Sequence, residues 1–256
     1  MLKTSKIIIY DEPTVPEIQI KKIKKCLKDT FNVDVEIREN FFQDANEKLF
    51  QDIATTRIFE LKKQFSKHIP TESEIIMEKE NTDNSQNEER VLYDGFELQK
   101  IISEFIPVIE SNQDILNIIF TNKLTCTFDE SDFRYHARAL IGTNPAIIST
   151  TGIIEAPAKP KEYYLELMTN FSKENIEKIK EKFKGEFLEF NDIRLSKVVE
   201  SYLLQAIMYY ETGEAFCKDK ECRLYNAHWQ KELLDAQLNK KFCKKHEKSL
   251  KEMTID

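Results

Sequence analysis

The 256-residue chain lacks an apolar run long enough to cross a bilayer, and its first residues lack the apolar core of a secretory signal. It also lacks a surplus of basic residues, since 38 Lys and Arg stand against 45 Asp and Glu, for a formal charge of -7. This balance argues against a protein that binds nucleic acid through bulk charge. Hydrophobic residues make up 41% of the chain, near the globular norm, so extended disorder is not expected. We expect a soluble, cytoplasmic protein with no membrane partner.

Cysteine is scarce and odd in number. Five cysteines spread along a chain without a secretory signal make a poor disulfide framework. Cys26, on the apolar side of an expected helix, and Cys126, in an expected strand, are most simply buried hydrophobes. The other three, Cys217, Cys222 and Cys243, lie in the last forty residues. This clustering indicates a metal site.

The C-terminal cysteines form two close pairs of ligand-type residues with a histidine. Cys217 and Cys222 are one pair, and Cys243 and His246 follow after a spacer of twenty residues. Such pairs suit a tetrahedral zinc ion, because each pair fits on one tight turn with both ligands within coordinating reach. Thiolate and imidazole ligands also suit zinc, which is a borderline-soft metal ion. Four protein ligands leave no open position for water, so one such ion would stabilise structure rather than catalyse. The alternative is that the thiols are ordinary small hydrophobes and His246 is a surface residue.

Hydrophobic periodicity in the first half predicts a β-α-β opening that feeds a parallel strand pair. A longer helix, a further strand, a mobile insertion without apolar residues and another helix follow. In chain order these elements are Lys6–Asp11, Val15–Phe31, Val33–Arg38, Asp44–Lys67, Glu72–Met77, Glu78–Arg90 and Phe96–Ile106.

Four strands are predicted next, at Ile115–Asn122, Leu124–Asp129, Ala137–Gly142 and Ala146–Glu155. After Pro160 the pattern is helical, at Tyr163–Met168, Ser172–Phe183 and Asp192–Glu211. Asp192 is the expected N-cap of the last of these helices, and Gly213 is its C′ residue. The chain thus reads as a single α/β domain, 1–256. A sheet-containing part spans 1–156, and a helical part spans 157–256 with a zinc knuckle at 217–246.

This C-terminal pattern resembles the archaemetzincins, a branch of the metzincin zinc peptidases. That family carries a helix with HExxHxxGxxHC, a second Cys after four residues, a Met two positions later and a final CxxC pair. With Cys217 as the motif cysteine, Gly213, Cys222 and Cys243 match, while His246 replaces the last cysteine and Leu224 the methionine. The resemblance implies a zincin-like mixed sheet with helices. The chain is also similar to a group of archaeal proteins described as metallopeptidases, in which the blocks YDEPTVPEIQI, ISTTGIIEAPAKP and CRLYNAHWQ are expected to recur.

The catalytic positions of the motif do not match. The three histidines fall on Ala206, Tyr210 and Phe216, and the general-base glutamate falls on Ile207. A catalytic zinc needs three protein donors and an acceptor beside its bound water, which these side chains do not supply. With only four histidines in the chain, His68, His136, His228 and His246, no shifted HExxH exists. The resemblance therefore implies a pseudoenzyme with a degenerate peptidase centre and a peptide- or protein-binding role.

A rival hypothesis keeps an active zinc-dependent metallopeptidase or hydrolase that uses other donors. His136, between two arginines, and His228, in the first turn of a helix capped by Asn226, are candidates together with Glu211 and Glu214. Their alternative roles are those of surface, capping and packing residues, with Trp229 as the packing anchor beside His228.

Two further interpretations stay open. The strand at 147–155 corresponds in the family to an edge strand that pairs with substrate, so it could bind an extended peptide, and the alternative is a paired interior strand. The lysine-rich tail from Lys240 to Lys251 is compatible with a nucleic-acid-binding module. Its acidic neighbours and the lack of interleaved aromatic residues argue against that function.

Overall fold

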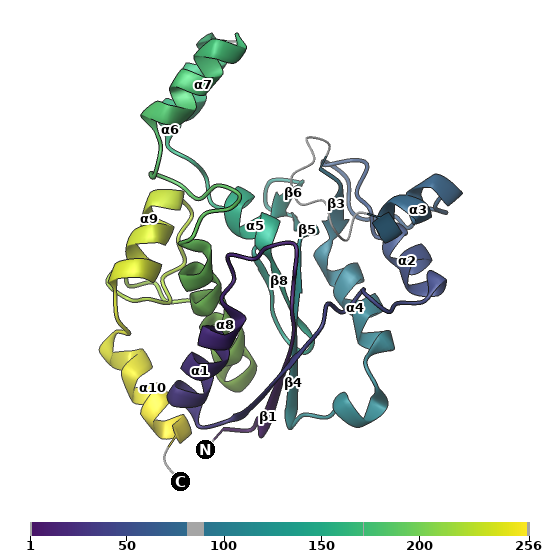
Figure 1. Cartoon of the computed structure of the whole chain (residues 1–256), viewed down its shortest axis with the longest axis vertical. Coiled ribbons are helices and arrows are strands. Elements are labelled where there is room, and N and C mark those ends of the chain that lie inside the picture. The colour runs from purple at the N-terminus through teal and green to yellow at the C-terminus, as the bar shows by residue number, and fades with distance from the viewer. Residues whose placement is uncertain (1, 81–89, 171, 255–256) are drawn as a thin grey trace.

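A five-stranded mixed sheet forms the centre of the computed structural model, which describes residues 2–80, 90–170 and 172–254 (Figure 1). The strand order is β2-β1-β4-β8-β7, with all neighbours parallel except the antiparallel pair of β7 and β8. The bounds are β1 Lys6–Tyr10, β2 Asp34–Arg38, β4 Ile115–Thr121, β7 Leu140–Ile141 and β8 Ala146–Ser149. The α/β class and the parallel pairing of the first two strands are thus confirmed.

Side-chain alternation along the strands builds one core on each face of the sheet. Ile7 and Ile9 of β1 pack in the core under α1 and α8, while Ile8 and Tyr10 pack in the core under α2 and α4. Because helices cover both faces, the central strands are continuous apolar runs. The helices are α1 Ile20–Phe31, α2 Glu47–Ala54, α4 Gly95–Phe105 and α8 Leu195–Thr212.

A second sheet, three-stranded in the order β3-β5-β6, lies beside the first (Figure 1). Its strands are β3 Leu92–Asp94, β5 Leu124–Asp129 and β6 Arg134–Ala137. The remaining helices are α3 Glu72–Glu80, α5 Thr150–Glu155, α6 Lys161–Thr169, α7 Lys173–Lys182, α9 Gln230–Leu234 and α10 Lys244–Thr254, with short 3-10 and π turns at Val108–Glu110 and Asp235–Asn239. The pair α6 and α7 projects from the body (Figure 1). Among the described helices, none has the length and apolar character that a bilayer span requires.

The predicted long helix at 44–67 is wrong beyond Ala54. Helix α2 begins at an Asn46 cap, whose side chain accepts from the Leu49 N–H, and ends at Thr55 and Thr56. These two hydroxyls donate to the carbonyls of the preceding turn, at 2.7 and 2.8 Å. The chain then pairs its Ile58 N–H with a β3 carbonyl rather than continuing the helix. The apolar residues after Ala54 that mimic a helical stripe therefore belong to an irregular segment.

The predicted strand at Glu72–Met77 is a helix instead. Thr71 and Glu74 form a reciprocal cap, since the Thr71 N–H donates to the Glu74 carboxylate at 2.7 Å and the Glu74 N–H to the Thr71 hydroxyl at 3.3 Å. The helix runs on to Glu80, so the expected insertion at 78–90 is wrong at its start, where Glu78 is fully buried. Residues 81–89 of that insertion lie outside the described residues.

The predicted strand at Ala146–Glu155 changes into α5 after four residues. The Ser149 side chain accepts from the Gly152 N–H at 2.8 Å and begins the helix. A Cβ on Gly152 would stand 2.1 Å from the Arg138 carbonyl oxygen, so a glycine is needed where α5 meets the chain beside β7. Since β8 pairs with β4 and β7, it is an interior strand rather than the expected edge.

Three smaller expectations also need correction. The predicted strand at 137–142 divides into the end of β6 and the separate strand β7, which belongs to the other sheet. Helix α8 begins after Arg194 without a side-chain cap, and Asp192 instead accepts from the Arg194 N–H at 2.9 Å. Asn226 does not cap α9, which begins after Trp229, so His228 precedes the helix. Gly213 does end α8 in the left-handed conformation, with φ 79°.

Candidate metal centre

The first ligand pair lies in a tight loop that follows α8. The Cys217 N–H donates to the Leu224 carbonyl at 2.7 Å, and the Asn226 N–H donates back to Cys217 at 3.0 Å. The Cys222 N–H closes the turn inside this loop by donating to Asp219 at 3.1 Å. Leu224, which the archaemetzincin motif would align with its methionine, is fully buried. The loop therefore holds Cys217 and Cys222 on one short, hydrogen-bonded unit.

The second pair lies at the start of α10. Cys243 directly precedes the helix and His246 lies in its first turn, so the two side chains are three residues apart on one helical face. A backbone bond from the Arg223 N–H to Lys241, 2.8 Å, ties this segment to the first loop. The long spacer returns through α9 and thus brings the two pairs together.

The four ligand atoms converge within 4.8 Å of one another. The Sγ atoms of Cys217 and Cys243 are 3.9 Å apart, and the Nδ1 of His246 lies 3.5 Å from the Cys222 Sγ and 3.2 Å from the Cys243 Sγ. Zn–S bonds of about 2.3 Å in a tetrahedron place the sulfur atoms about 3.8 Å apart. The Cys3His set therefore fits zinc in both geometry and donor chemistry.

The electrostatics of the cluster suit a cation at its centre. Burial raises the pKa of the Cys222 thiol to about 12. Burial also acts to raise the pKa of Cys243, but hydrogen bonds to its sulfur, the strongest from the backbone N–H of His246, outweigh burial and lower that pKa. Two backbone N–H groups point at sulfur, from Asp219 to Cys217 and from Cys243 to Cys222, each at 3.4 Å. These donors favour thiolates, and a bound cation would compensate for crowding three of them.

The imidazole of His246 is prepared as a neutral ligand. Burial and the neighbouring Lys245 ammonium lower its pKa, which favours the uncharged ring that a metal binds. Its Nδ1 faces the sulfurs, while its buried Nε2 has no hydrogen-bond partner among the described residues. Metal ligation by Nδ1 fixes the proton on Nε2.

The positions that the archaemetzincin motif would assign to a peptidase centre hold no histidine, cysteine or carboxylate. Ala206 and Ile207 are buried in the core between α8 and the sheet. The Tyr210 hydroxyl donates to the Gln113 carbonyl at 2.9 Å, and Phe216 is 44% exposed. The side chains at these positions therefore pack in the core, form one hydrogen bond or face solvent, and they do not converge on a metal site.

The alternative donors do not assemble into one site. Glu211 accepts hydrogen bonds from the N–H groups of Lys3 and Thr4 and from the Thr4 hydroxyl, at 2.8, 3.0 and 2.6 Å, and so fastens the N-terminal segment to α8. Glu214 pairs with Lys245, and His228 is exposed. Of these candidates, only His136 joins another group of donors.

That group contains two aspartates which the sequence interpretation missed. Asp129, Asp132 and His136 have donor atoms within 4.8 Å of one another around the β5–β6 turn. The His136 Nε2 lies 3.0 and 2.9 Å from the two Asp132 oxygens, and Arg134 also pairs with Asp132 at 2.8 Å. The available signal was the spacing of the two aspartates and the histidine across a hairpin. The cluster is partly exposed, and the Arg134 guanidinium already pairs with Asp132.

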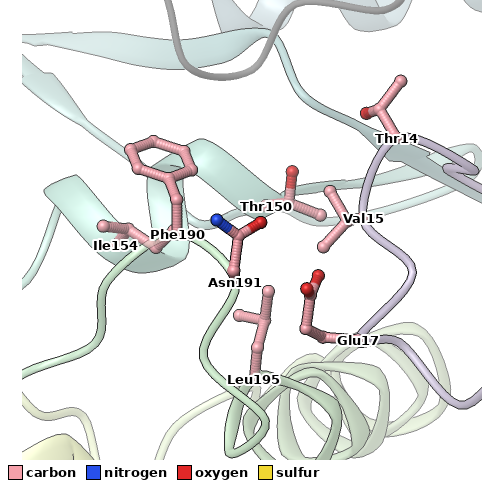
Figure 2. Close-up of a pocket in the computed structure, with 8 residues that line it drawn as sticks. All are labelled: Thr14, Val15, Glu17, Thr150, Ile154, Phe190, Asn191 and Leu195. Atoms are coloured by element: carbon pink, nitrogen blue, oxygen red, sulfur yellow. The ribbon is translucent and has the colours of Figure 1, made fainter.

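A small pocket lies where β1 and β8 end. Figure 2 shows the side chains that line it, among them Glu17, Thr150 and Asn191. The cavity of about 10 Å³ has room for a single water molecule at most. It therefore offers no space for a peptide side chain.

Comparison with known proteins gives two likenesses. A family model described as "Probable metallopeptidase family (DUF6775)" matches residues 3–253. Among solved structures, a zinc-dependent peptidase from Methanocorpusculum labreanum (strain Z) aligns over 96% of this chain and 99% of that chain, at 13% identity and a TM-score of 0.46. No curated protein matches the chain.

Proposed function

The chain belongs to the family described as probable metallopeptidases, and from this premise we propose that it is a zinc-binding, non-catalytic member that binds peptides or proteins. The observation that carries the zinc-binding part of the proposal is the convergence of Cys217, Cys222, Cys243 and His246, whose ligand atoms all lie within 4.8 Å of one another. A closed set of four protein ligands holds a structural ion, because no coordination position is left for water. The ion would crosslink α10 to the loop after α8.

The non-catalytic role is supported by the residues at the peptidase positions. A hydrolytic zinc needs an open coordination site and a carboxylate beside it. Ala206 and Ile207 are buried hydrophobes, and Glu211, the carboxylate nearest to them in α8, is hydrogen-bonded to the N-terminal segment. The archaemetzincin branch itself remains an interpretation of the motif.

The rival function, an active metallohydrolase, is favoured by one observation, the grouping of Asp129, Asp132 and His136. Two carboxylates and one imidazole could bind a metal and leave coordination positions open. The pairing of Asp132 with Arg134 works against this function, because an entering metal would have to compete with the guanidinium for the carboxylate.

A peptide-library assay with the zinc-loaded protein separates the two functions. We expect peptides to be retained without cleavage, whether zinc is added or removed by a chelator. Chelator-sensitive cleavage that His136→Ala abolishes, with folding intact and with His228→Ala as the matched control, would refute the non-catalytic proposal. Failure of every library peptide to bind would refute the peptide-binding role.

A further inference from the structure

A groove opens where β1 and β2 end, beside α2 and α4 on one face of the sheet. Its cavity measures about 350 Å³. Three aromatic side chains, Tyr10, Phe41 and Phe105, line it together with two carboxylates, Glu39 and Asp44, and the Arg38 guanidinium. The groove is large enough for a side chain and is separate from the candidate metal centre.

The aromatic walls are suited to a cation. The rings of Tyr10 and Phe41 meet edge to face with centroids 5.1 Å apart. The Lys48 ammonium already lies 5.3 Å from the centroid of Phe105, at the same wall. Because an aromatic face attracts a positive charge, these walls favour ammonium or guanidinium groups over anions.

The one cation in the lining is already compensated. Arg38 donates to both oxygens of Glu110, at 2.7 and 2.6 Å, to Glu36 at 2.6 Å and to the Tyr10 hydroxyl at 2.9 Å. Arg38 lowers the pKa of Glu110 and, with Lys6, that of Glu36 to about 2, so both carboxylates are ionised. With four donated hydrogen bonds and two anionic partners, Arg38 has little left to offer an entering anion.

The uncompensated charge at this end of the sheet is negative. Glu39 and Asp44 are exposed, and within the described ranges the nearby ion pairs join Arg38 to Glu110 and Lys48 to Asp52 rather than to them. Burial and the repulsion of Glu39 raise the pKa of Asp11, which lies just beyond β1. A cation entering the groove would therefore be attracted by two unpaired carboxylates.

An extended peptide can reach the groove along the sheet. Strand β2 is at the edge of the five-stranded sheet and pairs with β1 alone in the described part of it. Alternate backbone groups of an edge strand face outward and can pair with an added strand. Because Arg38 ends β2 and also lines the groove, a peptide along this edge would bring a side chain into the cavity.

We propose that the groove at the end of β2 binds a basic side chain, Lys or Arg, of an extended peptide. Its charged end would lie beside aromatic walls that already attract cations, since Arg38 lies 5.5 Å from the Tyr10 ring centroid and Lys48 lies 5.3 Å from that of Phe105. The Glu39 and Asp44 carboxylates would neutralise it. The inference deepens the proposed peptide-binding function by naming a place and a side-chain class, and it rests on that function.

The test uses the full-length, zinc-loaded protein and three blocked alanine pentapeptides that differ in their central residue. These residues are lysine, the uncharged and nearly isosteric norleucine, and glutamate. Amide shifts in two-dimensional NMR titrations report both the dissociation constant and the place of binding. We expect the lysine peptide to shift amides of Arg38 to Asn46 and to bind at least about fivefold more tightly than the other two.

Charge variants complete the design. The double change Glu39→Gln and Asp44→Asn should weaken binding of the lysine peptide about fivefold and lessen its salt dependence. Glu47→Gln, an exposed carboxylate of α2 outside the lining, is the matched control and should bind as the parent does.

The outcomes separate the inference from the function on which it rests. Equal binding of the three peptides, shifts confined to another surface, or no effect of the double change would overturn the inference and leave peptide binding intact. Absence of binding by these peptides and by the whole library would overturn both.

Discussion

The Nδ1 of His246 lies 3.2 Å from the Sγ of Cys243, one helical turn apart at the start of α10. This contact joins a residue of the C-terminal helix to a sulfur that also approaches Cys217 from the other ligand pair, at 3.9 Å. Two local pairs of ligands therefore become one site only after the chain between them has folded.

Metal analysis provides the first prediction. The purified protein should contain about one zinc ion per chain, and the double change Cys217→Ser and Cys243→Ser should remove it, because hydroxyl groups do not replace thiolates as zinc ligands. Elemental analysis after dialysis measures the metal. Cys26→Ser is the matched control, since that thiol is half-buried and outside the cluster, and it should leave zinc unchanged. A protein that never contains zinc would contradict the assignment.

Removal of zinc should loosen one region selectively. Metal-binding free energy contributes to folding free energy, so a chelator should destabilise the parts that the ion connects. Hydrogen exchange should accelerate most at residues 217–226 and in α10, while the central strands β1 and β4 should keep their protection. Equal exchange rates with and without a chelator would show that no ion connects these segments.

A substitution of Glu211 tests whether this carboxylate stabilises the fold or binds a metal. Its carboxylate accepts three hydrogen bonds from Lys3 and Thr4, so Glu211→Gln should lower the free energy of unfolding by about 1–3 kcal/mol. Urea denaturation measures the loss, and the zinc content should stay unchanged. A variant of full stability that lost metal would instead make Glu211 a ligand.

Gly152 provides a test of packing. A methyl group there would meet the Arg138 carbonyl oxygen at 2.1 Å, so Gly152→Ala should destabilise the protein by about 3 kcal/mol, the upper end of the usual range for overpacking. Thermal unfolding measures the effect. Gly185→Ala is the control, because its Cβ would meet no atom within 4 Å and only its positive φ opposes the change. Similar losses in the two variants would contradict the close approach.

The elements that could be predicted from the sequence are those whose signal is local. The apolar run at Lys6–Tyr10 correctly predicts a buried strand. The apolar residues that recur every four positions in α1 correctly predict a helix with one buried face. The Ile-Ile-Met run of α3 predicts a strand, whereas the Thr71 cap and the pairing of Glu78 with Arg57, 21 residues earlier in the chain, favour the helix. The switch from strand to helix at Thr150 begins at the Ser149 cap, and the close approach of Gly152 to the Arg138 carbonyl, which the sequence does not reveal, explains the glycine there.

The same distinction applies to the sites. The four zinc-type ligands could be found because each pair is close in sequence. The groove at the end of β2 could not, because strand ends, a loop and two helices contribute to it and no spacing marks their meeting. The grouping of Asp129 and Asp132 with His136 depends on the antiparallel pairing of β5 and β6, which the arginines adjacent to His136 in the sequence do not indicate.

The last prediction concerns Glu78, which is fully buried in α3 between two cations. Its carboxylate contacts Lys123 and Arg57 and accepts from the Tyr93 hydroxyl at 2.8 Å. Burial acts to raise its pKa, but Lys123 and Arg57 outweigh it and lower the pKa below 4.5. The stabilisation is therefore present above the unfolded-state pKa and is lost as the pH falls through the lower folded-state value.

Glu78→Gln should cost about 3–5 kcal/mol at pH 7, because it leaves the buried Lys123 ammonium without its anion and Arg57 with only the more distant Glu74. Its stability should also fall less steeply than the parent's below pH 4.5. Urea denaturation at several pH values measures both effects, with the exposed Glu80→Gln as control, and parallel pH profiles for parent and Glu78→Gln would refute the assigned role of this carboxylate.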